Sequence, residues 1–282
     1  MNSTIQHPSV TAVDITRSTA SCTMQIADFV ATEEPLEIIL AWQTDGSTMS
    51  KNISVTMRTP GNDAALAAGF LFTEAIIKNT SEVKEITTAA FNANQILVSL
   101  HNDTAPNLQQ TERNFYTSSS CGVCGKASID AIKTVSAFKH LKTNATISAK
   151  TLYRLPQLLR EQQLTFNKTG GLHAAALFTS AGSIQLLQED VGRHNALDKL
   201  IGMAWMQKML PLSVAILLLS GRASFELIQK ATMAGITIVA AVGAPSSLAV
   251  QLANEAGITL VGFLRDNSCN IYSHPKRIIF LE

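Results

Sequence analysis

Residues 214–264 read VAILLLSGRASFELIQKATMAGITIVAAVGAPSSLAVQLANEAGITLVGFL, and the fold class that we predict rests on this stretch. Three runs rich in Val, Ile and Leu alternate in it with two segments of helical periodicity. Such continuous apolar runs are typical of strands buried on both faces of a parallel sheet that helices cover. We therefore predict an α/β domain with a mostly parallel sheet. Its strands and helices are expected, in chain order, at residues 214–219, 225–234, 236–242, 246–256 and 259–264.

The chain before this stretch predicts a mixed arrangement of strands and helices. A hairpin is expected from residues 173–178 and 184–189, followed by a helix at residues 195–209. Further strands and one helix are expected at residues 36–42, 53–58, 62–77, 83–87 and 95–100. From these patterns we divide the chain into a flexible arm, an α+β N-terminal domain and an α/β C-terminal domain. Their predicted bounds are residues 1–25, 26–145 and 146–282.

The composition excludes several classes of protein. The 282 residues carry 22 Lys and Arg against 21 Asp and Glu, and a net charge of +1 supplies no field for nucleic-acid binding. Only 15% of the residues are charged, below the roughly 25% of soluble domains, which predicts extensive burial and favours a homodimer. The first residues lack a secretory pattern, and the longest apolar run is too short to cross a membrane. We expect a cytoplasmic protein.

The strongest chemical signal is SSSCGVCGK, residues 118–126, which contains Cys121 and Cys124. Gly122 and Gly125 leave space beside each sulfur, and the helical pattern that follows would stabilise a thiolate. Three kinds of chemistry compete at this spacing. A zinc site lacks a second pair of ligands, and a thioredoxin-like dithiol lacks a strand directly before it. The third is a nucleophilic thiol that holds sulfur as a persulfide, and the spacing alone does not select it.

Four polar loops follow predicted strands of the second half. They read EDVGRHNALDK (189–199), SGRASFE (220–226), GAPSS (243–247) and FLRDNS (263–268). The carboxyl ends of parallel strands meet at one edge of a sheet, where open α/β sheets bind ligands. Arginine side chains and the backbone N–H groups at helix starts both suit phosphate. We therefore predict a site for a phosphorylated ligand, formed jointly by these loops.

Several long motifs together resemble the FdhD family of sulfurtransferases, which are needed to mature formate dehydrogenase. The resemblance covers the chain from about Glu34 to Tyr272. The motifs are SSSCGVCGK, GGLHAAALF, EDVGRHNALDKLIG, SGRASFELIQKATMAGI, APSSLAVQLA and GFLRDNSCNIY.

The resemblance implies that Cys121 receives sulfur as a persulfide from a cysteine desulfurase, with Cys124 supporting the transfer. The sulfur would pass to the molybdenum cofactor, bis-molybdopterin guanine dinucleotide, before this cofactor enters the catalytic subunit of formate dehydrogenase. Guanine nucleotides such as GDP would mimic the cofactor. The residues expected to bind it are Arg193, His194, Arg222, Ser246, Ser247, Leu260, Val261, Gly262, Phe263, Leu264, Arg265, Asp266, Asn267 and Ser268.

The resemblance also implies that the C-terminal domain is similar in fold to cytidine deaminases. Deaminase chemistry is not expected, because that pattern needs a Glu two residues after its zinc-binding His, and here His173 is followed by Ala174 and Ala175. We expect no bound metal. Two alternatives stay open: a non-catalytic chaperone that uses the two cysteines as a zinc clip, and a thiol-disulfide oxidoreductase.

Overall fold

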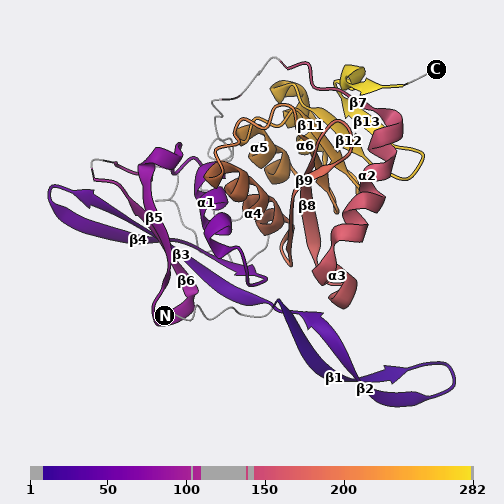
Figure 1. Cartoon of the computed structure of the whole chain (residues 1–282), viewed down its shortest axis with the longest axis horizontal. Coiled ribbons are helices and arrows are strands. Elements are labelled where there is room, and N and C mark those ends of the chain that lie inside the picture. The colour runs from indigo at the N-terminus through magenta and orange to yellow at the C-terminus, as the bar shows by residue number, and fades with distance from the viewer. Residues whose placement is uncertain (1–8, 103, 109–137, 139–142, 281–282) are drawn as a thin grey trace.

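The computed structural model describes residues 9–102, 104–108, 138 and 143–280. Two main sheets and the helices around them form the body of the molecule, and a two-stranded hairpin extends away from this body (Figure 1). No helix within the described ranges is long and apolar enough to span a membrane.

The C-terminal half is built on a six-stranded sheet with the strand order β13-β12-β11-β10-β8-β9. Its strands are β8 (His173–Phe178), β9 (Ile184–Asp190), β10 (Ile216–Leu219), β11 (Ile238–Ala241), β12 (Thr259–Gly262) and β13 (Asn270–Ser273). The pairs β10–β11 and β11–β12 are parallel, as predicted. The pairs β10–β8, β8–β9 and β12–β13 are antiparallel. The prediction of a mostly parallel sheet was therefore wrong. Residues 174–178 of β8 are buried like all of β10, so the apolar sequence of β8 does not distinguish an antiparallel strand from a parallel one.

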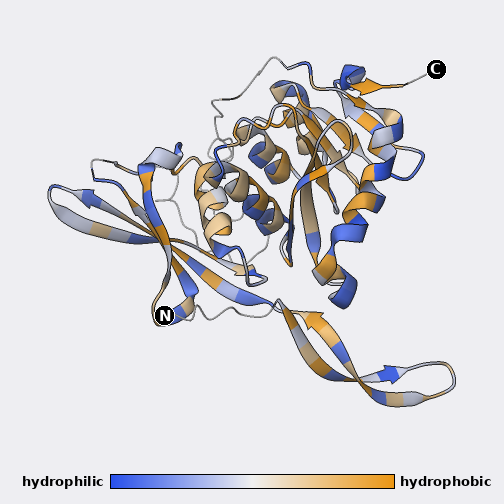
Figure 2. Cartoon of the chain, in the orientation of Figure 1, coloured by the Kyte–Doolittle hydropathy of each residue, from blue (hydrophilic) through white to orange (hydrophobic). Residues whose placement is uncertain are grey.

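Helices cover both faces of this sheet (Figure 1). One face packs against α4 (Arg193–Met206), α5 (Phe225–Met233) and α6 (Ser247–Ala256) in the larger core. The other face packs against α2 (Ala149–Gln162) in the smaller core. The strands are apolar, whereas the exposed face of α2 is polar (Figure 2). A short helix α3 (Leu164–Thr169) follows α2, and β7 (Ile147–Ser148) pairs with β14 (Ile278–Ile279), which follows the 3-10 turn η3 (Pro275–Arg277).

The N-terminal half contains a four-stranded sheet with the order β4-β3-β6-β5. Its strands are β3 (Glu34–Thr44), β4 (Ser47–Arg58), β5 (Val83–Ala89) and β6 (Asn92–Leu100), with the 3-10 turn η1 (Thr80–Glu82) before β5. The strands expected at residues 36–42 and 53–58 are observed as the antiparallel pair β3–β4, and the turn between them has positive φ at Asp45 and Gly46. These φ values match the two-residue turns that fit the twist of paired strands.

Helix α1 (Asp63–Thr73) ends four residues before the predicted end at Ile77. Ala75 has a φ of +56°, and the amides of Ile76 and Ile77 donate back to the carbonyl of Leu71. This turn places Ile76 and Ile77 in the larger core. Their burial, rather than helix propensity, ends the helix.

Residues predicted as part of a flexible arm form a regular hairpin instead. Strand β1 (Val10–Ser18) pairs antiparallel with β2 (Thr23–Ala31) along its whole length. The strands are rich in Val, Ile and Thr, which favour extended backbone. Both faces stay largely accessible to solvent, so the clean apolar alternation of a half-buried strand is absent from the sequence. The segment predicted as a flexible arm, residues 1–25, thus contains β1 and the start of β2, which were not predicted.

The two halves are joined by close packing of α1 against α4. A Cβ added to Gly69 would lie 1.9 Å from the carbonyl oxygen of Asp198, and one added to Gly202 would lie 1.8 Å from that of Ala65. Only glycine permits this backbone approach. The helix pair therefore holds the N-terminal sheet against the helices of the C-terminal sheet.

A buried ionic cluster strengthens the same junction. Lys230 of α5 pairs with Asp198 of α4 at 2.9 Å and donates to the hydroxyl of Thr73 of α1 at 2.9 Å. Burial works against the charge of Lys230, but Asp198 and Glu74 raise its pKa above the usual value. Burial and, to a smaller extent, the nearby charge of Glu74 raise the pKa of the Asp198 carboxyl, whereas Lys230 and Thr73 act to lower it. We take the pair as charged, because both partners form short hydrogen bonds within it.

Candidate functional site

The four polar loops lie at one edge of the six-stranded sheet. Strand β8 is antiparallel to both neighbours, so β9 runs in the same direction as β10, and Asp190 at the end of β9 pairs with His173. Beyond the strands, the amide of Gly243 donates to the carbonyl of Gly221 at 2.8 Å, and that of Phe263 donates to the carbonyl of Gly243 at 3.1 Å. The predicted convergence of these loops is therefore observed, although the sheet is mixed.

Three helices begin at this edge. The N-cap residues of α4, α5 and α6 are Gly192, Ser224 and Ser246. The Ser246 hydroxyl caps α6 by accepting from the amide of Ala249, whereas no side chain of the cap residue caps α4 or α5. Helix N-termini carry partial positive charge and present free N–H groups, so this edge favours an anion.

A buried carboxylate fixes the turn between β9 and α4. Asp190 is fully buried and accepts from the amides of Gly192 at 2.8 Å and Thr59 at 3.2 Å. It also accepts from the Asn195 side chain at 3.2 Å and pairs with Lys199 at 2.6 Å. Lys199 and these hydrogen-bond donors therefore balance the negative charge of Asp190. Its hydrogen bonds hold the start of α4 and tie it to the segment that follows β4.

Arg193 and His194 lie in the first turn of α4, which begins two residues before its predicted start at Asn195. The Nε of Arg193 is buried and has no hydrogen-bond partner in the described part of the chain. Buried guanidinium nitrogens are normally paired, so this atom is one that an anionic ligand would satisfy.

His173 belongs to the same edge, although it was not predicted as a site residue. It starts β8, and a Cβ on Gly221 would lie 3.3 Å from its Nδ1. Burial, together with the positive charges of Arg193 and His194, lowers the pKa of His173, against the opposing effect of Asp190. His173 is thus a neutral side chain at neutral pH. Its place at the start of β8, opposite Asp190 in the β8–β9 pairing, brings it here.

His194 lies between two side chains of α5. Its Nε2 is 3.4 Å from the hydroxyl of Ser224 and 3.8 Å from a carboxylate oxygen of Glu226. Hydrogen bonding from His194 lowers the pKa of Glu226 to about 2. Burial acts to raise this pKa, and hydrogen bonds from the Glu226 backbone and from Ser224 lower it further. Glu226 is therefore ionised at physiological pH. His194 was predicted from the sequence as a site residue, but Ser224 and Glu226 were not.

The shifted Glu226 predicts a pH-dependent contribution to stability. A carboxyl whose pKa falls from 4.5 to about 2 on folding stabilises the protein above pH 4.5, and this contribution disappears as the pH approaches 2. We expect Glu226→Gln to lower the free energy of unfolding by about 1–2 kcal/mol at neutral pH and by much less near pH 2. Chemical denaturation at both pH values measures this difference. An equal loss at both would contradict it.

The loops after β10 and β11 are packed backbone to backbone. A Cβ on Gly243 would lie 2.9 Å from the Cα of Arg222, so no other residue fits there without a shift. Arg222 itself is exposed, and its guanidinium forms no hydrogen bond or ion pair with any described residue. Ser246 and Ser247 are also exposed beside it. This part of the edge offers a free cation and two hydroxyls.

The segment after β12 divides into buried and accessible residues. Leu260, Val261 and Leu264 are fully buried in the two cores, so their side chains do not reach a ligand at the edge. Phe263 is 42% exposed and has a φ of +51°, a conformation that bulky residues rarely adopt. Arg265 is exposed but donates to the carbonyl of Val242 at 2.7 Å.

The remaining predicted residues of this segment have different surroundings. Gly262 is buried, and a Cβ there would lie 2.8 Å from Pro245. Asp266, Asn267 and Ser268 are exposed, and the Ser268 carbonyl accepts from the Arg265 amide at 2.9 Å. They form the outer part of the loop.

The predicted cysteine pair cannot be located relative to this edge, because Cys121 and Cys124 lie outside the described residues. Their chemistry stays a prediction. Two free thiols lie in the described segments. Cys22 is exposed at the tip of the β1–β2 hairpin. Burial raises the pKa of Cys269, although a hydrogen bond with Tyr153 acts to lower it. No group of three or more His, Cys, Asp or Glu in the described segments is placed to hold a metal ion.

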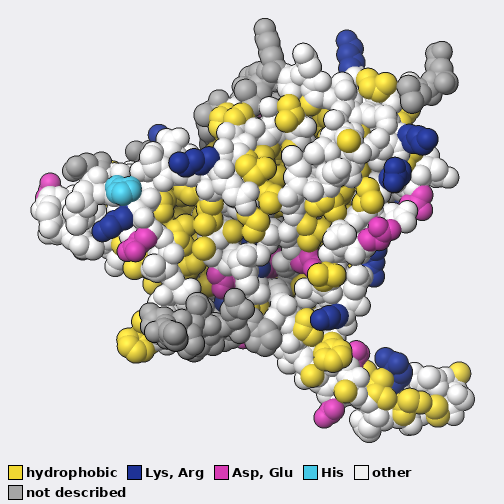
Figure 3. Space-filling model, viewed as in Figure 1, with side chains coloured by type: hydrophobic (Ala, Val, Ile, Leu, Met, Phe, Trp, Pro, Cys, Tyr) yellow, Lys and Arg dark blue, Asp and Glu magenta, His cyan; other side chains and the backbone are white. Residues whose placement is uncertain are grey.

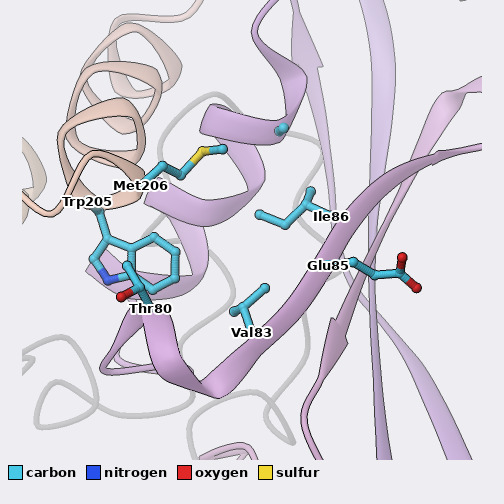
Figure 4. A pocket seen from close by; sticks show the side chains of 7 residues that line it. Thr80, Val83, Glu85, Ile86, Trp205 and Met206 are labelled. Atoms are coloured by element: carbon cyan, nitrogen blue, oxygen red, sulfur yellow. The ribbon is translucent and has the colours of Figure 1, made fainter.

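A cavity of about 260 Å³ lies elsewhere, between α1, β5 and the C-terminal end of α4 (Figure 4). Its walls are mostly apolar and include Ala64, Val83, Ile86, Trp205 and Met206. The candidate edge is at the opposite end of α4, roughly 20 Å away at the helical rise per residue. The cavity contains none of the predicted site residues, and we assign the site to the sheet edge.

Comparisons with known proteins agree with these observations. The sulfur carrier protein FdhD of Mycolicibacterium paratuberculosis is 50% identical over 272 residues, which cover 94% of this chain and 97% of that protein. The same-named protein of Sulfolobus acidocaldarius is 45% identical over 251 residues, covering 89% of this chain and 91% of that one.

Among solved structures, a protein of Desulfotalea psychrophila described as a formate dehydrogenase accessory protein superposes with a TM-score of 0.76. The two chains are 22% identical, and the match covers 96% of this chain and all of that one, so they share a fold. The FdhD/NarQ family model matches residues 31–279. The chain therefore belongs to the FdhD/NarQ family.

Proposed function

We propose that this protein is a sulfur carrier that serves formate dehydrogenase. It takes sulfur from a cysteine desulfurase onto Cys121 and transfers it to bis-molybdopterin guanine dinucleotide before that cofactor enters the catalytic subunit of the dehydrogenase. The cofactor is the substrate of this transfer. The relatives named sulfur carrier protein FdhD support the first half of this proposal, and the sheet edge supports the second.

One observation carries the cofactor-binding half of the proposal. Three helix N-termini converge at the sheet edge with two arginines whose guanidinium groups have unused donors, Arg193 and Arg222. The carboxylate nearest to the start of α4, Asp190, is neutralised by Lys199. A dinucleotide with a diphosphate group would supply acceptors for these unused donors and negative charge for the helix N-termini. Phe263 offers its exposed ring to a base.

The sulfur step needs only the chemistry of thiols. The Cys121 thiolate attacks the terminal sulfur of the desulfurase persulfide, a new S–S bond forms on Cys121, and the desulfurase cysteine leaves as a thiolate. Attack of the Cys124 thiolate on Cys121 Sγ then forms a disulfide and releases hydrosulfide to the cofactor. An external thiol reduces that disulfide. Such chemistry requires a reducing compartment, and we place the protein in the cytoplasm.

The proposal extends to the assembly and the fold relationship. We propose a homodimer, supported by the low charge content and by exposed apolar side chains on the projecting hairpin, Met24, Phe29 and Val30 (Figure 3). Light scattering of the purified protein tests the dimer.

We also propose that the C-terminal half is related in fold to cytidine deaminases, without their zinc chemistry.

Titration with GDP tests the cofactor site. A charge-assisted hydrogen bond to phosphate contributes about 1.5–3 kcal/mol, so we expect Arg222→Ala to weaken GDP binding roughly tenfold or more. Arg222 is the better target than Arg265, because Arg265 also holds the loop through the carbonyl of Val242. Arg154→Ala is the matched control, since Arg154 is an exposed arginine on α2, which packs on the other face of the sheet. Equal affinity of wild type and Arg222→Ala would place the nucleotide elsewhere.

A further inference from the structure

We propose that Glu226 is a positioning residue of the cofactor site, which holds His194 as a hydrogen-bond donor to the phosphate groups of the bound nucleotide. The inference rests on the proposed function, because it names how that same site recognises its ligand. Glu226 itself is not expected to contact the phosphate.

The geometry places His194 between two elements that meet at the edge. The imidazole projects from the first turn of α4, and its Nε2 faces Ser224 Oγ at 3.4 Å and Glu226 Oε2 at 3.8 Å, both from the start of α5. The Ser224 side chain forms no cap bond with its own helix. The side chains of His194 and Glu226 are only 15% and 22% exposed, so the ring has little freedom to turn away.

A carboxylate partner determines which ring nitrogen carries a proton. Because Nε2 faces an ionised carboxylate, Nε2 is protonated, and Nδ1 is the nitrogen left for a ligand. Nδ1 has no hydrogen-bond partner among the described residues. To donate to phosphate, the ring takes up one proton from solvent at Nδ1, and the Glu226 carboxylate balances the charge that results. His173 on β8 also interacts electrostatically with His194, and Arg193 and Asp190 are the other charged groups that act on His173.

Glu226 is an acidic side chain at a proposed anion site, so the direction in which its removal changes ligand affinity distinguishes between its possible roles. If Glu226 acted on the phosphate directly, its negative charge would repel the ligand, and its removal would strengthen binding. If Glu226 only stabilised the start of α5 through the helix dipole, its removal would leave the affinity of the folded protein unchanged. A positioning role alone predicts weaker binding, and only while His194 is present.

The test is a double-mutant cycle with GDP and inorganic pyrophosphate as ligands, on wild type, Glu226→Gln, His194→Gln and the double variant. We expect Glu226→Gln and His194→Gln each to weaken the binding of both ligands by roughly fivefold to tenfold. The double variant is expected to bind no more weakly than His194→Gln. Tighter or unchanged binding by Glu226→Gln, or losses that multiply in the double variant, would overturn the inference.

Two further measurements separate positioning from loss of structure. Nitrogen-15 spectra of the histidine rings are expected to show His194 protonated at both nitrogens in the GDP complex of wild type but not of Glu226→Gln. Glu161→Gln, an exposed glutamate on α2, is the matched control and should leave affinity unchanged. If wild type bound neither ligand, the proposed cofactor site and this inference would fall together. If wild type bound and Glu226→Gln bound more tightly, only the inference would fall.

Discussion

Cys121→Ala is expected to abolish the activation of formate dehydrogenase while leaving the binding of GDP within about twofold of wild type. In the proposed transfer the Cys121 sulfur accepts the sulfur from the desulfurase, so removal of this thiol leaves the protein unable to carry sulfur to the cofactor. The nucleotide, by contrast, is proposed to bind at the loops of the six-stranded sheet. Complementation of a strain that lacks its own sulfur carrier measures the first effect, and titration with GDP measures the second.

The matched control for this variant is Cys22→Ala. Cys22 is an exposed free thiol at the tip of the β1–β2 hairpin, so its removal tests whether any accessible cysteine accepts sulfur. We expect full complementation by Cys22→Ala. Substantial formate dehydrogenase activity with Cys121→Ala would contradict the carrier role, and loss of GDP binding by a folded Cys121→Ala protein would contradict the separation of the two functions.

Gly202→Ala is expected to have the largest effect on folding. The new Cβ would lie 1.8 Å from the carbonyl oxygen of Ala65, a backbone atom that cannot move aside without displacing α1. Overpacking against backbone forces the helices apart, and we expect the free energy of unfolding to fall by roughly 3 kcal/mol or more. The Lys230 contacts to Thr73 and Asp198 would be strained by the same displacement.

Urea denaturation of Gly202→Ala and Gly171→Ala measures this effect against a matched control. Gly171 has no positive φ, and a Cβ there would meet only Ala31 Cβ and the Thr169 carbonyl, at 3.7 and 3.9 Å. Gly171→Ala should therefore change stability little. Equal stability of Gly202→Ala and wild type would show that the α1–α4 contact is looser than the structure has it.

The sequence predicted the elements of the fold where burial leaves a simple pattern. The runs at residues 216–219, 238–241 and 259–262 were predictable because they are buried on both faces and separated by helical segments. Helix α2 was not predicted, since Pro156 lies inside it and interrupts the helical pattern. The β1–β2 hairpin was not predicted either, for a different reason. Its residues are hardly buried, so hydropathy carries little signal there.

The candidate site was predictable as a set of loops but not as a set of contacts. Arg193, Arg222 and Arg265 follow strand ends, and topology alone brings them to one edge. His173 starts its strand instead of following one, and the antiparallel pairing of β8 with its neighbours brings it to the same edge. Glu226 looks in the sequence like an ordinary acidic residue of a first helical turn. Its role depends on its distance from His194, which sequence spacing does not determine.

The most direct test of the central proposal is the intact mass of the protein after incubation with a cysteine desulfurase and cysteine. Wild type and Cys22→Ala are predicted to gain the mass of one sulfur atom, and Cys121→Ala is predicted to gain nothing. Treatment with a thiol reductant should remove the added mass, as expected for a persulfide. No gain in wild type, or an equal gain in Cys121→Ala, would contradict the assignment of Cys121 as the sulfur carrier.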